Sequence, residues 1–389
     1  YTGKSTILQT WGSLHIVSRF ISIGGWINAI IPILIVPYYS VIGGWVIKYL
    51  IEYFAGHSKT LAGDAYFTTF ISNGWSTEIC FIIFTLFTLG IIYAGVRNGI
   101  ERVSKFMMPI LIVLSLIIAV YSVTRPGAIE GVKYFLVPNF DHFSWMTVVS
   151  AMGQMFYSLS IAMGILITFG SYMKKDTSIE KSTENVEIFD TAIAIMAGLM
   201  IIPAVFAFSG GNAETLKSGP ALMFITIPKV FANMGFGTAI GVVFFLLVLF
   251  AAVTSSIALT ESAVSTFEDE LHWSRKKSTV FMGMVMLLLG TLSCLGYGPL
   301  ANFKILGMQF LDFFDFITNS VMMPIAAIAT CLLVSKVVGV DKIEEEIKKD
   351  GQAFRRKKIF CFMIKYLCPL FAAIILISSV ANAFGIITM

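Results

Sequence analysis

The sequence contains few charged residues. Asp, Glu, Lys and Arg make up 13% of the 389 residues, whereas hydrophobic residues make up 57%. Soluble globular domains carry about 25% charged residues, so this composition excludes an ordinary water-soluble fold. The net charge of +4 is spread over short polar segments, which leaves no basic face for nucleic acid. We therefore expect a multi-pass membrane protein surrounded by the lipid bilayer.

The sequence also has few histidines, and its cysteines are not spaced as pairs. The four histidines fall in predicted loops or at segment edges, where none is placed for a buried Ser-His or Cys-His pair. The five cysteines lie in or beside apolar segments and show no paired metal-ligand spacing. The sequence therefore predicts neither an enzyme nor a zinc site or a disulfide.

Long apolar segments, by contrast, recur along the whole chain. A helix needs about 20 apolar residues to cross a bilayer, and hydropathy and length together predict about nine such spans. We interpret residues 1–389 as one all-α transmembrane domain. The expected spans are 21–54, 77–96, 106–123, 145–173, 186–208, 237–266, 279–297, 309–335 and 359–387.

The segments between the spans are polar or rich in turn-forming residues. Residues 97–105 and 124–144 are expected to be loops, the second because of its Pro-Gly and Pro-Asn pairs. A short helix is expected at 220–231 and a solvated surface helix within 341–358. The distribution of Lys and Arg places the N-terminus of the chain on the cytoplasmic side.

The fourth span is interrupted by polar residues. Residues 154–164 place Tyr157, Ser158, Ser160 and Gly164 at a depth where a lipid-facing helix would be apolar. Backbone can leave the helix at membrane depth only where protein or a water-filled cavity receives its N–H and C=O groups. A break of this kind is typical of a transport site.

A second group of polar residues lies in the span 237–266. Thr254, Ser255 and Ser256 are three consecutive hydroxyls near mid-bilayer, and Glu261 follows about two turns later. Hydroxyls in membrane helices commonly bond to their own helix or to a neighbouring helix, which is the structural alternative. Oxygen ligands suit a hard cation such as sodium, and backbone carbonyls of a distorted helix could complete its shell.

Further polar groups lie within or near the spans. A carboxylate in a bilayer normally faces a partner or a cavity, which favours an ion-site role for Asp190 over a solvated helix end. Asp312 and Asp315 share one helical face, either as gate residues or as interfacial anchors. Tyr38 and Tyr39 lie mid-span, and a phenol there needs a hydrogen-bond partner, either a nearby carbonyl or a substrate carboxylate.

Five short segments, in this order and spacing, carry a resemblance to a known family. They are Pro37-Tyr38-Tyr39-Ser40, Gly99-Ile100-Glu101-Arg102, Gly153-Gln154-Met155-Phe156-Tyr157-Ser158-Leu159-Ser160, Thr254-Ser255-Ser256 and Phe267-Glu268-Asp269-Glu270-Leu271. Together they resemble the bacterial branch of the neurotransmitter:sodium symporters, and the similarity covers essentially the whole chain. The resemblance implies an inverted-repeat sodium symporter fold in which family helices 3 to 11 are present. The first two family helices are expected to have no counterpart in this sequence.

The resemblance also implies roles for individual residues. The Tyr39 hydroxyl would bind an amino-acid carboxylate, and Tyr157 would replace the aromatic lid of the family. The implied substrate-binding residues are Ile35, Tyr39, Tyr157, Ser158, Ser160, Met163, Ser255 and Leu259.

The resemblance further implies two sodium sites and a gate. Ser158 matches a ligand of the first site, while the Ala251 carbonyl and the Thr254 and Ser255 hydroxyls match the second. With a one-residue shift in alignment, Asp190 matches an acidic residue that replaces chloride in chloride-independent members. Asp315 would be the acidic half of the outer gate.

The function implied by the resemblance is sodium-coupled uptake of an amino acid by alternating access across the inner (plasma) membrane. The apolar pocket residues suggest a hydrophobic or aromatic substrate, and chloride is not expected to be required. Two alternatives stay open at this point. One is a truncated remnant that does not transport, and the other is a proton-coupled transporter of the same fold with Glu261 or Asp190 as the proton carrier. The sequence does not indicate an oligomeric state.

Overall fold

The computed structural model describes residues 19–174, 176–212, 216, 219–349 and 354–385, and these residues are almost entirely helical. Among them, eight helices are long and apolar enough to cross a membrane. The ninth expected span, residues 145–173, is divided between two shorter helices. The expected all-α membrane architecture is therefore confirmed.

The first half of the chain contains the broken segment. Its helices are α2 (Arg19–Phe54), α3 (Ser58–Leu61), α4 (Tyr66–Ser72), α5 (Gly74–Tyr93), the π-helix η1 (Val96–Glu101), α6 (Arg102–Val123), α7 (Ala128–Leu136), the 3-10 helix η2 (Phe140–His142), α8 (Trp145–Ser158), α9 (Ile165–Tyr172) and α10 (Ile179–Ser209).

The second half of the chain has several long helices that contain π-helical turns. Its elements are α11 (Gly219–Ala221), η4 (Leu222–Thr226), α12 (Ile227–Ala232), α13 (Gly237–Glu270), α14 (Arg275–Leu295), α15 (Phe310–Asp315), η5 (Phe316–Met322), α16 (Met323–Leu332), η6 (Leu333–Val338), α17 (Val340–Lys348), α18 (Lys357–Phe362), η7 (Met363–Leu367) and α19 (Cys368–Ala383). The expected short helix at 220–231 and the surface helix within 341–358 correspond to α11–α12 and α17.

Two segments expected to be loops are helical. Residues 97–105 form η1 and the start of α6, and residues 124–144 contain α7. The turn formers in 124–144 mark the two ends of α7: Gly127 has a φ of 82° at its N-cap, and Pro138 and Asn139 follow its C-cap Val137. A nine-residue helix is too short to be stable alone and depends on packing, which α7 obtains against α10.

The helix α10 begins earlier than its apolar pattern predicts. The polar residues 179–185 form its first two turns, where only a linker was expected before residue 186. Ser178 is the N-cap, and its side chain accepts a hydrogen bond from the Lys181 backbone N–H at 3.4 Å. A good cap and solvent therefore extend the helix beyond its apolar part.

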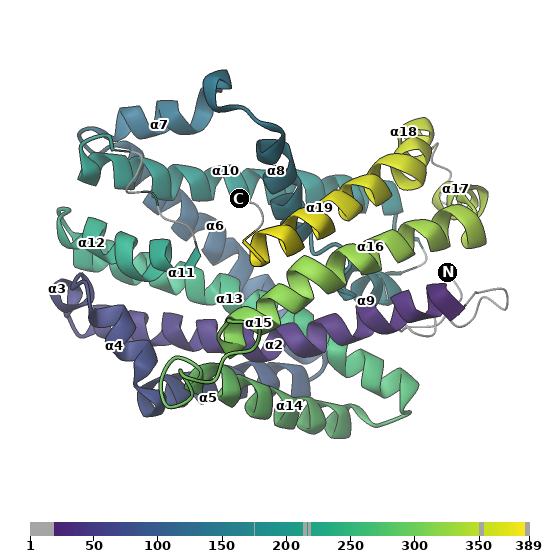
Figure 1. Ribbon diagram of the computed structural model, residues 1–389, viewed down its shortest axis with the longest axis horizontal. Helices are drawn as coiled ribbons and strands as arrows, with labels where there is room; N and C mark the ends of the chain where they lie inside the picture. Colours follow the sequence, from purple (N-terminus) through teal and green to yellow (C-terminus); the bar gives the residue numbers. More distant parts are fainter. Residues whose placement is uncertain (1–18, 175, 213–215, 217–218, 350–353, 386–389) are drawn as a thin grey trace.

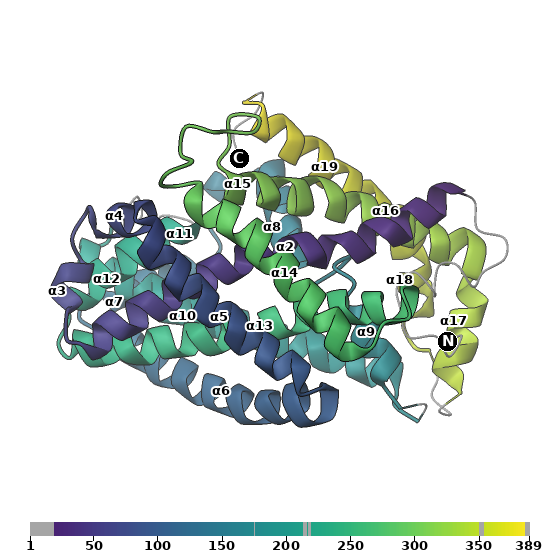
Figure 2. The ribbon, with the colours of Figure 1, turned by 90° about the horizontal axis from the view of Figure 1, so that it is seen from below.

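The helices α2 and α13 run through the middle of the bundle and pack against each other. Figure 1 shows α5 and α14 on one side of α2 and α16 and α19 on the other, and Figure 2 gives the perpendicular view. Because α13 also contacts α5, α6, α9 and α14, these two helices form the scaffold against which the broken segment is placed.

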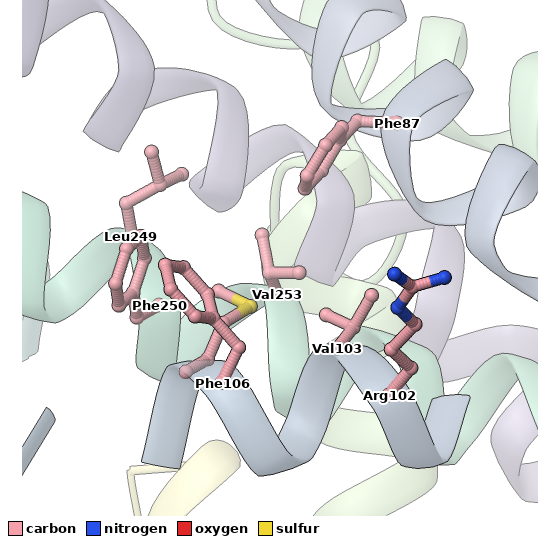
Figure 3. A pocket seen from close by; sticks show the side chains of 8 residues that line it. Phe87, Arg102, Val103, Phe106, Leu249, Phe250 and Val253 are labelled. Atoms are coloured by element: carbon pink, nitrogen blue, oxygen red, sulfur yellow. The ribbon is translucent and has the colours of Figure 1, made fainter. Parts of the chain in front are cut away.

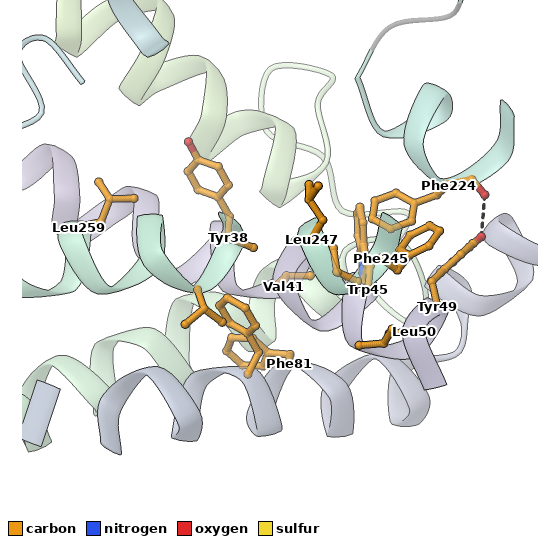
Figure 4. Packing of buried hydrophobic residues seen from close by; sticks show 14 of the residues in the cluster. Tyr38, Val41, Trp45, Tyr49, Leu50, Phe81, Phe224, Phe245, Leu247 and Leu259 are labelled. Atoms are coloured by element: carbon orange, nitrogen blue, oxygen red, sulfur yellow. Dashed lines mark hydrogen bonds between the residues drawn. The ribbon is translucent and has the colours of Figure 1, made fainter. Parts of the chain in front are cut away.

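An aromatic cluster fills one end of the contact between α2 and α13 (Figure 4). Trp45 meets Phe67 edge-on with ring centroids 5.3 Å apart, and Tyr49 stacks on Phe245 at 5.2 Å. The Tyr49 hydroxyl donates a 2.7 Å hydrogen bond to the Phe224 carbonyl, which satisfies the buried phenol. The other end of this contact, toward Tyr38 and Leu259, leads to the candidate site.

Gly44 allows the backbones of α2 and α5 to touch, which gives a first prediction. A Cβ at Gly44 would lie 2.7 Å from the Phe81 nitrogen and 2.9 Å from the Cys80 carbonyl carbon, and a backbone cannot move aside as a side chain can. Gly44→Ala is expected to destabilise the protein by about 1–3 kcal/mol, as overpacking does. The measurement is thermal unfolding of the detergent-solubilised protein.

Gly90→Ala in α5 is the matched control, because a Cβ there meets nothing within 4 Å. It is expected to leave stability unchanged or to raise it by about 0.5–1 kcal/mol. If Gly44→Ala unfolds at the wild-type temperature, the close backbone contact between α2 and α5 is wrong.

Candidate functional site

The break predicted within 154–164 is present between α8 and α9. The helix α8 begins with a capping box at Ser144 and ends at Ser158, and α9 begins at Ile165. Three residues of the intervening segment have positive φ, namely Ser160 (54°), Ala162 (60°) and Gly164 (75°). A non-glycine residue with positive φ is uncommon, so this segment cannot continue the helix.

Ser158 and Asp190 meet at the end of α8. The Ser158 hydroxyl donates a 2.7 Å hydrogen bond to Asp190 Oδ1, which joins α8 to α10. Ser158 is exposed and Asp190 is partly exposed, so neither side chain is part of the apolar core. The pair presents oxygen ligands and a negative charge beside the broken backbone, a combination that suits a hard cation.

Tyr39, Ser255 and Tyr157 come together from three helices. The Tyr39 hydroxyl faces the Ser255 hydroxyl, so α2 and α13 each supply a polar group to one place. Tyr157 at the end of α8 is 37% exposed and lies close enough to Tyr39 to interact with it electrostatically. The three residues converge although they are far apart in the sequence.

Three apolar residues that were expected in the substrate pocket lie in the core. Ile35, Met163 and Leu259 are all buried and belong to the same hydrophobic cluster. Met163 comes from the unwound segment, whereas the other two come from the scaffold helices α2 and α13. Ser160, also in the unwound segment, is partly exposed.

The hydroxyls of α13 bond mainly to their own helix. Thr254 Oγ1 donates to the carbonyls of Phe250 and Ala251, each at 3.0 Å, which is the structural alternative named above. This bond nevertheless holds the Ala251 carbonyl oxygen and the Thr254 hydroxyl side by side, so one hard cation could contact both. Ser255 is exposed, whereas Ser256 is fully buried and its Oγ has no partner among the described residues.

Asp315 belongs to a polar cluster that also contains Tyr38. Asn319 donates to Asp315 Oδ1 at 2.6 Å, and the Tyr38 hydroxyl lies 3.3 Å from Thr318 Oγ1. Asp315 also interacts electrostatically with Tyr157. The Tyr38 phenol thus has protein partners. Asp315, the expected gate residue, lies near Tyr157, the expected lid.

Sequence reasoning missed the partners Thr318 and Asn319. The sequence carried a signal for both, because residues three and four positions after Asp315 lie on the same face of a helix. Asp312 likewise has a partner that was not expected, since the Tyr297 hydroxyl donates to its Oδ1 at 3.0 Å.

Glu261 does not lie with the hydroxyl residues 254–256 of α13, which corrects the expectation from its spacing. It is fully buried, and both of its carboxylate oxygens accept from the Arg275 guanidinium, at 3.0 and 2.5 Å. The Tyr172 hydroxyl donates to Oε1 at 2.7 Å, and Arg275 Nε donates to the Ile92 carbonyl at 3.0 Å. The Glu261 carboxylate oxygens are therefore bonded to α9 and α14 rather than to the hydroxyls of α13.

Comparisons with known proteins agree on one family. The family model described as the sodium:neurotransmitter symporter family matches residues 68–386. The sodium-dependent transporter YhdH of Bacillus subtilis is 32% identical over 367 residues, which cover 94% of this chain and 80% of that protein. A sodium-dependent transporter of Haemophilus influenzae is 29% identical over 374 residues, covering 93% of this chain and 80% of the relative.

A solved structure extends the similarity to three dimensions. The crystal structure of MhsT in complex with L-phenylalanine superimposes with a TM-score of 0.83 at 31% identity, over 96% of this chain and 85% of that one. Sequence and structure therefore point the same way. The chain belongs to the sodium:neurotransmitter symporter family and is a sodium-dependent membrane transporter, not an enzyme.

Proposed function

We propose that this protein couples the entry of sodium to the uptake of a hydrophobic or aromatic amino acid by alternating access. The observation that carries the proposal is the unwound segment between α8 and α9, which follows Tyr157 near Tyr39 of α2, whose hydroxyl faces Ser255 of α13. Tyr39 would hold the substrate carboxylate, and the buried Ile35, Met163 and Leu259 would form an apolar wall for its side chain. The complex of MhsT with L-phenylalanine supports an aromatic or hydrophobic substrate.

Sodium would act as the co-substrate at two sites. Ser158 would contribute to the first, and the Ala251 carbonyl with the Thr254 and Ser255 hydroxyls to the second. Each sodium ion that enters contributes about 2.3 kcal/mol per 100 mV of membrane potential, which can drive substrate uphill. Joint binding would favour closure of the outer mouth only if substrate and sodium bind the closed state more tightly than the open one.

The negative charge of Asp190 supports independence from chloride. Its carboxylate accepts from the Ser158 hydroxyl, so a fixed anion already lies beside the proposed first sodium site. A mobile anion would then be unnecessary for charge balance. For the gate, Asp315 would close over the substrate together with Tyr157, to which it is electrostatically coupled. We also propose that the N-terminus of the chain lies on the cytoplasmic side of the inner (plasma) membrane, as the positive-inside rule predicts.

The test is binding of labelled L-phenylalanine and L-leucine to the purified protein, with sodium replaced by choline and, separately, chloride replaced by gluconate. Binding is expected to require sodium and to be unchanged in gluconate. Thr254→Ala and Ser255→Ala are each expected to raise the sodium concentration needed for half-maximal binding about tenfold, since each removes one coordinating oxygen from the proposed second site.

Ser256→Ala is the matched control, because its buried hydroxyl is not assigned to an ion, and it is expected to leave sodium dependence unchanged. Persistence of binding in choline would overturn the sodium mechanism in favour of proton coupling. Absence of binding under every condition would favour a remnant that does not transport amino acids.

A further inference from the structure

A groove of about 380 Å³ lies between α5, α6 and α13, and none of the residues that line it is assigned to the substrate, the sodium sites or the gate. Its walls are apolar and come from Phe87 of α5, Val103 and Phe106 of α6, and Leu249 and Phe250 of α13 (Figure 3). Phe87 and Phe106 are 54% and 66% exposed, so the groove opens to the surroundings of the bundle. In a chain that spans a membrane, those surroundings are lipid acyl chains.

One charged residue lines this groove. Arg102, the first residue of α6, lies at one end, while Leu249 and Phe250 lie toward the other (Figure 3). Arg102 is exposed, and it makes no hydrogen bond or ion pair with any residue that the structure describes. A guanidinium without a counterion at an apolar groove is available for an external anion.

The charges around Arg102 favour such an anion. The nearby carboxylate, Glu101, already binds Lys105 at 2.6 Å. Arg97 and Lys174 also lie within electrostatic reach of Glu101. Three cationic side chains therefore act on the Glu101 carboxylate beside Arg102, which gives this end of α6 a local excess of positive charge.

We propose that this groove binds one acyl chain of an anionic phospholipid, whose phosphate is held by the Arg102 guanidinium. Arg102 and Phe106 are one helical turn apart, about 6 Å along the axis, which matches the step from a phospholipid head group into its hydrocarbon. The guanidinium binds phosphate in a bidentate manner, and basic pockets between membrane helices recognise anionic head groups. A protein partner would need an acidic side chain at this depth to meet Arg102, which is costly in a bilayer.

The experiment is native mass spectrometry of the purified full chain in a mild detergent, titrated with phosphatidylglycerol or with phosphatidylcholine that carries the same acyl chains. One phosphatidylglycerol is expected to be retained about fivefold more tightly than phosphatidylcholine, as one basic residue at a membrane surface permits. Arg102→Gln is expected to abolish this preference, whereas Arg102→Lys keeps most of it. Val103→Trp, which fills the groove, is expected to reduce retention of both lipids.

Arg125→Gln is the control, because Arg125 lies beyond the other end of α6 and bonds to Tyr121. It is expected to leave the preference intact. Equal retention of the two lipids by the wild type, or an unchanged preference in Arg102→Gln, would overturn the proposal. Displacement of phosphatidylglycerol by inorganic phosphate would show an anion site without an acyl-chain groove. A dimer that is lost in Val103→Trp while no lipid is retained would assign the groove to a second copy of the chain.

Discussion

Arg275→Ala is expected to destabilise the protein by about 3–5 kcal/mol, because it leaves the Glu261 carboxylate buried without a counterion. Glu261 is fully buried on α13, and Arg275 at the start of α14 supplies two of its hydrogen bonds. Tyr172 supplies a third from α9, the second half of the broken segment. The loss would therefore weaken the attachment of α9 to the scaffold, and thermal unfolding of the solubilised protein would measure it.

The size of this effect depends on which partner is removed. Arg275 is partly exposed and also lies 3.5 Å from Glu268, so Glu261→Ala leaves the guanidinium with another carboxylate. Glu261→Ala is therefore expected to cost less than Arg275→Ala. The double variant Glu261→Gln with Arg275→Gln removes both charges and is expected to recover much of the loss. A double variant as unstable as Arg275→Ala would contradict the assignment of the cost to an unpaired buried charge.

Gly164→Val is expected to weaken sodium-dependent binding of the amino acid about tenfold. Gly164 has a φ of 75° and is the N-cap of α9, and a left-handed backbone costs an L-residue about 1–2 kcal/mol, with a β-branched side chain at the upper end. The strain lowers the population of the unwound conformation, and the apparent affinity falls in proportion. Equilibrium binding of labelled L-phenylalanine in sodium would measure the change.

Gly164→Asn separates backbone conformation from the loss of glycine as such. Asparagine adopts the left-handed conformation far more readily than valine, so Gly164→Asn is expected to bind within about threefold of the wild type. If both variants bind as the wild type does, the unwound geometry at this residue is not required for binding. If both lose binding equally, the side chain rather than the backbone is responsible.

The sequence predicted much of the fold because membrane spans are a local property. A run of apolar residues long enough for a bilayer is visible in one segment, so α2, α5, α6, α13 and α14 match their predicted spans closely. The predictions failed where a helix is polar or short. The start of α10 and the whole of α7 are stabilised by a cap or by packing on a neighbour, and neither is visible in the hydropathy of the segment.

The candidate site, like the fold, was only partly predictable from the sequence. The break at residues 159–164 was visible, because serine and glycine interrupt an apolar segment, and the resemblance to a family assigned roles to residues around it. Glu261 shows the limit of spacing as evidence. Its position two turns beyond Thr254 suggested one ion site, yet its side chain points to Arg275 and Tyr172 instead.

The sequence by itself determined that this is a membrane protein, where its spans lie and where one of them is broken, because hydrophobicity and turn preference act within short segments. Only the tertiary structure decided which polar groups meet. Ser158 and Asp190 are separated by 32 residues, Tyr172 and Glu261 by 89, and Tyr38 and Thr318 by 280. Most buried polar groups have a hydrogen-bond partner, and which residue that is depends on how α2, α9, α10 and α13 pack.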